Sequence, residues 1–83
     1  MEKYYVYILK SITLNKFYIG QTNNLERRLF YHNSGYSKST KSGMPWNLVY
    51  KKLFLSRAEA MKREKQLKSY KNKSYLEKII DNQ

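Results

Sequence analysis

Hydrophobic positions along this chain predict three β-strands. Residues 4–9 (YYVYIL) are aromatic or aliphatic without interruption, and such a run is typical of a buried strand. A polar connection with the turn residue Asn15 leads to a second apolar run at 17–19, so the two runs predict a hairpin. Gly20 ends the second run, where the backbone requires a positive φ or a close approach of another group. A third strand is predicted over 48–55.

Capping patterns and apolar spacing predict three helices. Asn23 to Glu26 and Ser56 to Glu59 both resemble capping boxes, in which a polar side chain and a glutamate satisfy free amides at a helix start. The predicted helices cover about 24–33, 57–69 and 73–80, and 36–45 is predicted as a loop with at most one helical turn. The order β-β-α-β-α-α predicts a mixed α/β (α+β) domain, in which helices pack on a small sheet.

The charge balance of the chain favours a polyanionic partner. Seventeen Lys and Arg against six Asp and Glu give a net charge of +11 over 83 residues, enough for one compact domain, 1–83. Nine tyrosines distinguish the chain from a disordered basic tail, which is poor in aromatic residues. The absence of cysteine and the single histidine exclude a disulfide framework, thiol catalysis and a cysteine- or histidine-rich metal site.

No segment of the sequence predicts a membrane span or a secretion signal. The longest uncharged apolar run is the strand at 4–9, whereas a membrane helix needs about 20 residues. The N-terminus lacks a basic stretch followed by an apolar one. We therefore expect a small cytoplasmic domain with no membrane partner.

Glu64 breaks the apolar stripe of the predicted helix 57–69. It is expected on the side of that helix that carries Ala58, Ala60, Met61 and Leu67. Removing an unpaired carboxylate from water costs several kcal/mol, so Glu64 must be paired, hydrated in a cleft or bound to a cation. The simpler interpretation is a surface ion pair with the lysine four residues later, and a metal site is the alternative.

Arg28 and His32 interrupt the apolar stripe of the first predicted helix, and here the interrupting groups are basic rather than acidic. A guanidinium on such a stripe favours a planar anion, phosphate or carboxylate, whereas a lone histidine is usually a structural hydrogen-bonding residue. Tyr18 is expected beside Tyr7 across the hairpin. Together with Glu64, these side chains suit phosphodiester chemistry, in which a phenol beside cations loses its proton more easily and acts as a base.

The same residues carry a resemblance to a known family. Tyr5-Val6-Tyr7, followed after ten residues by Tyr18-Ile19-Gly20, resembles the paired signature of the GIY-YIG nuclease superfamily, and most of all its small free-standing bacterial members. Tyr5 occupies the position of the first glycine of that signature. Arg28 and His32 have the spacing of the family's first-helix arginine and histidine. The resemblance implies a three-stranded antiparallel sheet flanked by helices.

The resemblance also implies catalytic roles. Tyr7 and Tyr18 would act as the base or orient the attacking water, Arg28 would bind the scissile phosphate, and His32 would carry a proton or orient a phenol. Glu64 would be the sole protein ligand of one Mg²⁺ or Mn²⁺, with water and phosphate oxygens completing its octahedron.

Two further positions follow from the family pattern. Gly20 would let the chain turn tightly beside the site. The family also has an asparagine near the end of its core, for which Asn82 is the first choice and Asn72 the second.

The function that follows is a metal-dependent endonuclease of low sequence specificity acting on DNA rather than RNA, in repair or recombination. Higher sequence specificity would have to come from a protein partner, because the chain carries no second DNA-binding module. Alternatives are a non-catalytic nucleic-acid-binding module that uses the same basic face, and a structural or protein-interaction domain. Basic residues along the last two helices would follow the nucleic-acid backbone: Lys62, Arg63, Lys65, Lys68, Lys71 and Lys73.

Overall fold

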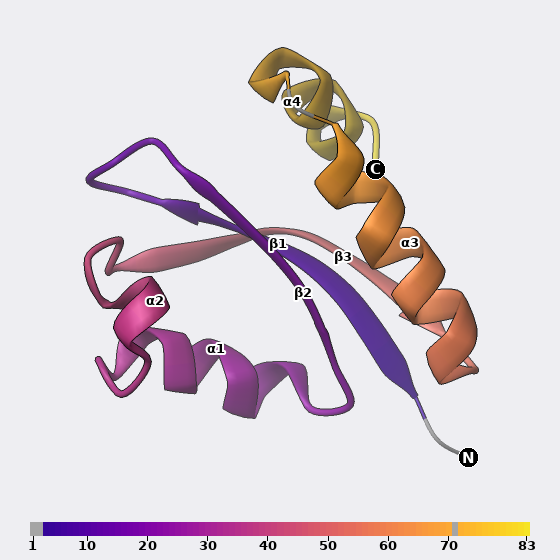
Figure 1. Cartoon of the computed structure of the whole chain (residues 1–83), viewed down its shortest axis with the longest axis horizontal. Coiled ribbons are helices and arrows are strands. Elements are labelled where there is room, and N and C mark those ends of the chain that lie inside the picture. The colour runs from indigo at the N-terminus through magenta and orange to yellow at the C-terminus, as the bar shows by residue number, and fades with distance from the viewer. Residues whose placement is uncertain (1–2, 71) are drawn as a thin grey trace.

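A three-stranded antiparallel sheet with helices on both faces makes up the computed structural model, which describes residues 3–70 and 72–83 (Figure 1). Helices α1 and α2 lie on one face, and α3 and α4 lie on the other. The element order and the antiparallel sheet confirm the predicted fold class. The elements are β1 (Tyr4–Ser11), β2 (Phe17–Thr22), α1 (Leu25–Asn33), α2 (Lys38–Lys41), β3 (Trp46–Phe54), α3 (Arg57–Ser69) and α4 (Lys73–Asp81).

The strand order is β2-β1-β3, so β1 is the central strand and is covered on both faces. This position explains the unbroken apolar run at its start, because a strand covered on both faces has no solvent side for polar residues. In the hairpin register Tyr7 lies opposite Gly20, and Leu9 lies opposite Tyr18. Because side chains alternate along a strand, these four residues share one face of the sheet.

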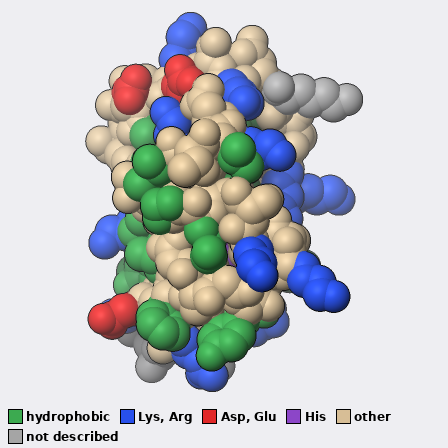
Figure 2. Space-filling model, turned by 90° about the vertical axis from the view of Figure 1, so that its left-hand side faces the viewer, with side chains coloured by type: hydrophobic (Ala, Val, Ile, Leu, Met, Phe, Trp, Pro, Cys, Tyr) green, Lys and Arg blue, Asp and Glu red, His purple; other side chains and the backbone are tan. Residues whose placement is uncertain are grey.

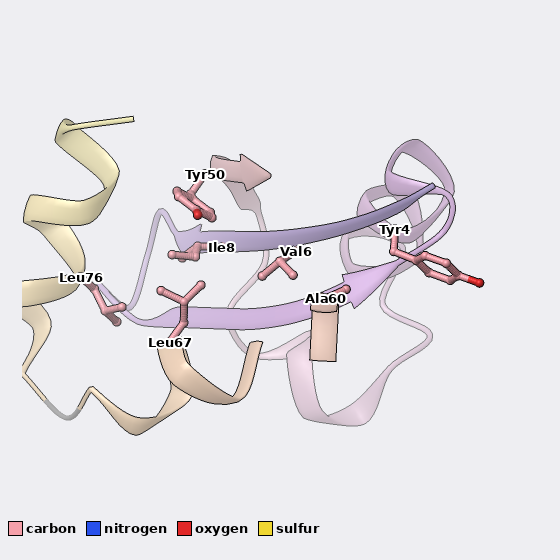
Figure 3. Packing of buried hydrophobic residues seen from close by; sticks show 7 residues of the cluster. All are labelled: Tyr4, Val6, Ile8, Tyr50, Ala60, Leu67 and Leu76. Atoms are coloured by element: carbon pink, nitrogen blue, oxygen red, sulfur yellow. The ribbon is translucent and has the colours of Figure 1, made fainter. Parts of the chain in front are cut away.

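The face of the sheet toward α3 and α4 carries the larger core. Alternate β1 residues, together with a tyrosine of β3, meet apolar side chains from the two helices, as Figure 3 shows. Val6, Ile8 and Leu67 are fully buried there. Complete burial of such side chains contributes about 1.5–3 kcal/mol each to the free energy of unfolding. The cluster consists of Tyr4, Val6, Ile8, Tyr50, Ala60, Leu67 and Leu76.

The opposite face carries a smaller and more polar core. Tyr7 and Leu9 of β1 pack with Trp46 of β3, and leucines of α1 lie against them. This layer also buries His32 and Thr40, so it combines apolar packing with buried hydrogen-bonding groups.

Helix α1 begins one residue later than predicted. Asn24, and not Asn23, is its N-cap, and the Asn24 side chain accepts from the backbone N–H of Arg27 at 3.0 Å. The turn is fixed because the hydroxyl of Thr22 accepts from the Asn24 amide and donates to the Asn24 carbonyl. Glu26 therefore occupies the second helical position and does not complete a capping box. The second predicted cap is confirmed, since Ser56 accepts from the amide of Glu59 at 3.2 Å.

Candidate active site

Tyr7 lies at the centre of the candidate site, on the face of the sheet covered by α1. Its side chain is only 2% exposed. A Cβ atom built on Gly20, its cross-strand neighbour, would lie 2.6 Å from the Tyr7 hydroxyl oxygen. Gly20 thus leaves room for the phenol, which is the close approach that the sequence offered as one alternative. Its predicted role in a tight turn is wrong, because Gly20 lies inside β2.

A chain of hydrogen bonds leads from Tyr7 into the protein. The Tyr7 hydroxyl lies 3.0 Å from His32 Nε2, and His32 Nδ1 lies 3.2 Å from the hydroxyl of Thr40. The indole N–H of Trp46 in turn donates to the Thr40 carbonyl at 2.8 Å. His32 is 2% exposed, and both of its ring nitrogens have partners. The chain therefore fixes the imidazole and the phenol relative to each other.

Tyr18 and Arg28 complete the group on this face. The ring of Tyr18 is stacked near that of Tyr7, with centroids 6.4 Å apart, and lies 4.6 Å from the His32 ring centroid. Arg28 is exposed, and its charge acts on both Tyr7 and His32. Ring contacts and a hydrogen bond therefore bring Tyr7, Tyr18 and His32 together, and Arg28 is near enough for its charge to act on two of them.

Burial sets the protonation of the phenol and the imidazole. The pKa of Tyr7 is raised well above its ordinary value of 10.0, mainly by desolvation and then by Tyr18, and the opposing effect of Arg28 is smaller. The pKa of His32 is lowered from 6.5 by burial and by Arg28. The expectation that cations would ease proton loss from the phenol is therefore wrong for Tyr7, because desolvation outweighs the guanidinium.

Glu64 approaches the site from the other layer of the fold. Its side chain is 21% exposed and accepts from Lys68 Nζ at 2.6 Å, the ion pair of the simpler interpretation. The Glu64 carboxylate also raises the pKa of Tyr7, so its charge acts on the phenol. Lys68 and Tyr18 line one hollow along β2. The Glu64–Lys68 pair thus lies toward the β2 edge of the sheet, where the two layers meet.

A comparison with protein families identifies the family of the chain. The model of the GIY-YIG catalytic domain matches residues 3–78. The chain belongs to the GIY-YIG family. It therefore has a nuclease-type fold, and the resemblance noted in the sequence is confirmed.

Relatives of this GIY-YIG domain are small bacterial proteins of uninformative name. A UPF0213 protein of Staphylococcus haemolyticus is 42% identical over 80 residues, which cover 95% of this chain and 96% of the relative. One from Oceanobacillus iheyensis is 41% identical over 68 residues, covering 81% and 78%. The solution NMR structure of a UPF0213 protein from Bacillus halodurans has a TM-score of 0.58 and 32% identity, covering 93% of this chain and 82% of that one.

Across the described residues, no helix has the length and apolar character to cross a membrane.

The stripe of α3 that faces the GIY-YIG sheet differs from the predicted one. Ala60 and Leu67 are buried, but Met61 is 54% exposed, and Ala58 is exposed as well. Arg63 occupies the inward line between the two buried residues and packs against a tyrosine of β3. Glu64 is therefore at the margin of the buried stripe and keeps contact with solvent.

The predicted asparagine and basic residues are spread over several surfaces. Asn82 caps the C-terminus of α4 and lines a hollow with Arg63 on the face of the sheet away from Tyr7 and His32, so the structure does not bring it to those side chains. Asn72 caps the N-terminus of α4. Lys73 donates to the carbonyl of Asn15. Lys62, Lys65 and Lys68 line a hollow beside Glu64, whereas Lys71 lies outside the described residues.

The five of these basic residues that the structure describes therefore do not form a single track along the helices. Arg63 points to the β3 side of α3, away from the hollow beside Glu64. On the face that carries the hairpin loop, Lys and Arg side chains project around a band of hydrophobic ones, and acidic side chains are few (Figure 2).

Sequence reasoning missed the residues that support His32. Thr40 is fully buried in α2, the short helix within the segment predicted as a loop with at most one helical turn. Asn33 ties the end of α1 to β3, because its side chain accepts from the Trp46 amide at 2.7 Å and donates to the Trp46 carbonyl at 3.1 Å. No local signal marks Thr40, since its partners lie in other elements.

The two pKa shifts predict a stability that falls at both ends of the pH scale. Because the pKa of folded His32 lies below 6.5, its contribution to the free energy of unfolding is present above that pH and is lost as the pH falls below it. Because the pKa of folded Tyr7 lies above 10.0, its contribution is present below that pH and is lost as the pH rises further. Urea unfolding from about pH 5 to about pH 11 measures both losses. Tyr7→Phe should flatten the alkaline loss, and an unchanged alkaline loss in this variant would contradict the shift.

Proposed function

We propose that this GIY-YIG domain is a metal-dependent endonuclease that hydrolyses phosphodiester bonds of DNA with low sequence specificity, in repair or recombination. The observation that carries the proposal is the buried hydrogen bond between Tyr7 and His32, with Tyr18 stacked beside it and Arg28 acting on both. Burying polar groups in a small core costs free energy that apolar residues would not require. A role of these side chains in the reaction explains why the fold keeps polar groups at these buried positions.

Tyr7 and His32 offer a path for a proton. In the tautomer with its hydrogen on Nδ1, His32 donates to Thr40 and accepts the phenolic hydrogen of Tyr7 at Nε2. The Tyr7 oxygen then retains lone pairs for a hydrogen of the attacking water. Because the raised pKa disfavours a free phenolate, we infer that Tyr7 passes its proton to His32 while it takes one from water. The lowered pKa of His32 makes the imidazolium a short-lived species, which must release its proton before the next turnover.

Arg28 and Tyr18 position the substrate in this proposal. The exposed guanidinium of Arg28 lines a hollow of about 310 Å³ with Arg27 and Tyr31, large enough for a phosphate and part of its sugar. A guanidinium donates paired hydrogen bonds to phosphate oxygens and stabilises the charge that develops on them. Tyr18 is half-buried beside Tyr7 and would orient the attacking water.

Glu64 is the residue that would hold one Mg²⁺ or Mn²⁺. No group of three or more His, Cys, Asp or Glu side chains that could hold a metal occurs in the described part of the chain. A single half-buried carboxylate fits an ion that also takes water and substrate phosphate as ligands, as Mg²⁺ does. When bound, such an ion polarises the phosphate and stabilises the leaving oxygen. Lys68, released from its ion pair with Glu64, would be free to contact a phosphate.

A cleavage screen tests this proposal. Labelled duplex, single-stranded and branched DNA, and RNA of the same sequence, are incubated with the protein in Mg²⁺, in Mn²⁺ and in EDTA. We expect cleavage of DNA that depends on the metal and shows little sequence preference. Binding without cleavage in any metal would favour the non-catalytic binding module. Equal cleavage of RNA would overturn the preference for DNA, and strong sequence selectivity only after addition of a cell extract would indicate a protein partner.

A further inference from the structure

A second hollow lies on the far side of the GIY-YIG sheet from α1. It has a volume of about 670 Å³, and its walls come from β3, α3, α4 and the C-terminal residues. Tyr50 on its wall belongs to the core under α3, and the hollow shares no residue with the one that Arg28 lines. The candidate active site and this hollow are therefore separate surfaces, on opposite faces of the sheet (Figure 1).

The lining of this hollow is strongly cationic. Lys52, Arg63 and Lys78 contribute to its walls, and no Asp or Glu among the described residues does. Lys51 borders the hollow, but it pairs with Tyr7 in the sheet and lines a hollow with leucines of α1, so its side chain lies on the other face. The acidic residues of α4, Glu77 and Asp81, are not part of the lining. Three positive charges around a concave surface attract an anion more strongly than the same charges on a convex surface.

Arg63 is held in place by neutral partners. Its Nε and Nη2 atoms lie 3.4 and 3.3 Å from the Tyr50 hydroxyl oxygen, and Nη1 donates to Gln66 at 2.8 Å. These acceptors orient the guanidinium without cancelling its charge. An oriented guanidinium loses little side-chain freedom when it binds a phosphate, so it binds more tightly than a mobile one.

The rim of the hollow adds an aromatic surface. Tyr75 is 50% exposed, and its ring leans on that of Tyr70, with centroids 4.5 Å apart. The side chain of Gln83 donates to the Val49 carbonyl at 2.6 Å, which holds the end of the chain against β3. A fixed cation beside a supported, exposed aromatic ring is typical of sites that take one nucleotide, its phosphate on the cation and its base or sugar on the ring.

We propose that this hollow is a second nucleic-acid site, which holds a nucleotide from a segment of the substrate that is not cleaved. The inference rests on the proposed function, since it assigns the hollow to the same nucleic acid. Because the two surfaces lie on opposite faces of the sheet, a substrate that fills both must pass around the sheet or carry a branch. Long or branched DNA should therefore bind more tightly than a short fragment that reaches only the active site.

Removing two cations from the hollow tests this assignment by binding alone. Lys52→Gln with Lys78→Gln changes two exposed side chains of the lining, and Lys16→Gln with Lys41→Gln is the control, with the same change in charge at two exposed positions outside the hollow. Fluorescence anisotropy in EDTA gives the affinity for a branched DNA and for a short single-stranded fragment at several salt concentrations. Since no cleavage is needed, failure of the nuclease proposal leaves this comparison interpretable.

We expect the hollow variant to bind branched DNA roughly tenfold more weakly than the control variant does at low salt. The magnitude of its slope of log affinity against log salt should fall by about 1.4–1.8, as expected if the two lysines neutralise the phosphates on either side of the bound nucleotide. Both variants should bind the short fragment equally. Identical affinities and slopes of the two variants for branched DNA would overturn the assignment. So would an NMR titration in which a mononucleotide 5′-phosphate shifts the amide signals of Tyr75 and Lys78 while the branched DNA does not.

Discussion

Tyr7→Phe is expected to reduce single-turnover cleavage by about 10³-fold while DNA affinity stays within about twofold. The substitution removes only the hydroxyl that would take the water's proton and donate to His32. General base catalysis contributes about 10²–10⁴-fold to a rate, which sets the expected size of the loss. The rate constant is measured with enzyme in excess over labelled DNA, and the affinity is measured in EDTA.

Tyr36→Phe is the matched control for this variant. It also removes one phenolic hydroxyl, but from a side chain that is 77% exposed. The control should cleave at the rate of the unmodified protein. Because Tyr7→Phe leaves His32 Nε2 buried without its partner, it should also lower the free energy of unfolding by about 1–3 kcal/mol. A Tyr7→Phe variant that folds and cleaves at the unmodified rate would refute the proton path.

Glu64→Gln is expected to reduce cleavage by at least about 10³-fold in Mg²⁺ and in Mn²⁺, because the amide is a poor ligand for a hard divalent cation. DNA affinity should be unchanged or slightly higher, since Lys68 loses its carboxylate partner. Cleavage and binding are measured as for Tyr7→Phe. Paramagnetic broadening of amide signals near residue 64 by Mn²⁺ in the presence of uncleaved DNA gives a second readout, and it should disappear in the variant.

Glu59→Gln is the control for the loss of one carboxylate from α3. Glu59 is exposed in the first turn of the same helix, so its substitution changes net charge equally. It should leave the rate and the broadening unchanged. Cleavage by Glu64→Gln at the unmodified rate would restrict Glu64 to its ion pair with Lys68.

The features predictable from the sequence are those that depend on local periodicity. The uninterrupted apolar run at 4–9 identified the central strand because only a strand covered on both faces lacks polar positions. The twofold alternation of side chains placed Tyr18 beside Tyr7 once the hairpin was recognised. The spacing of Arg28 and His32 by one helical turn brought both to the same side of α1.

The features that the sequence left undecided depend on contacts between distant residues. Asn23 and Asn24 are equally good caps by residue type, and the hydroxyl of Thr22 decides between them. The buried line of α3 runs through Ala60 and Leu67 with Arg63 between them on Tyr50, so Met61 lies on the exposed side. No local pattern contains either preference.

The protonation of Tyr7 is the clearest case of such a contact-dependent property. The sequence shows nearby cations, and these lower the pKa of a phenol. It does not show how deeply the phenol is buried, and desolvation proved the larger effect. Thr40, the second partner of His32, was likewise invisible, because it comes from a separate short helix.

The central claim is that side chains from both faces of the sheet form one catalytic centre, and the double variant Tyr7→Phe/Glu64→Gln tests it most directly. Residues that act as a unit show strongly non-additive losses, because removing any one of them already disables the step that all of them serve. The single-turnover rate of the double variant should therefore lie within about tenfold of the slower single variant. A loss equal to the product of the two single losses would show that Tyr7 and Glu64 act independently, and would contradict the claim.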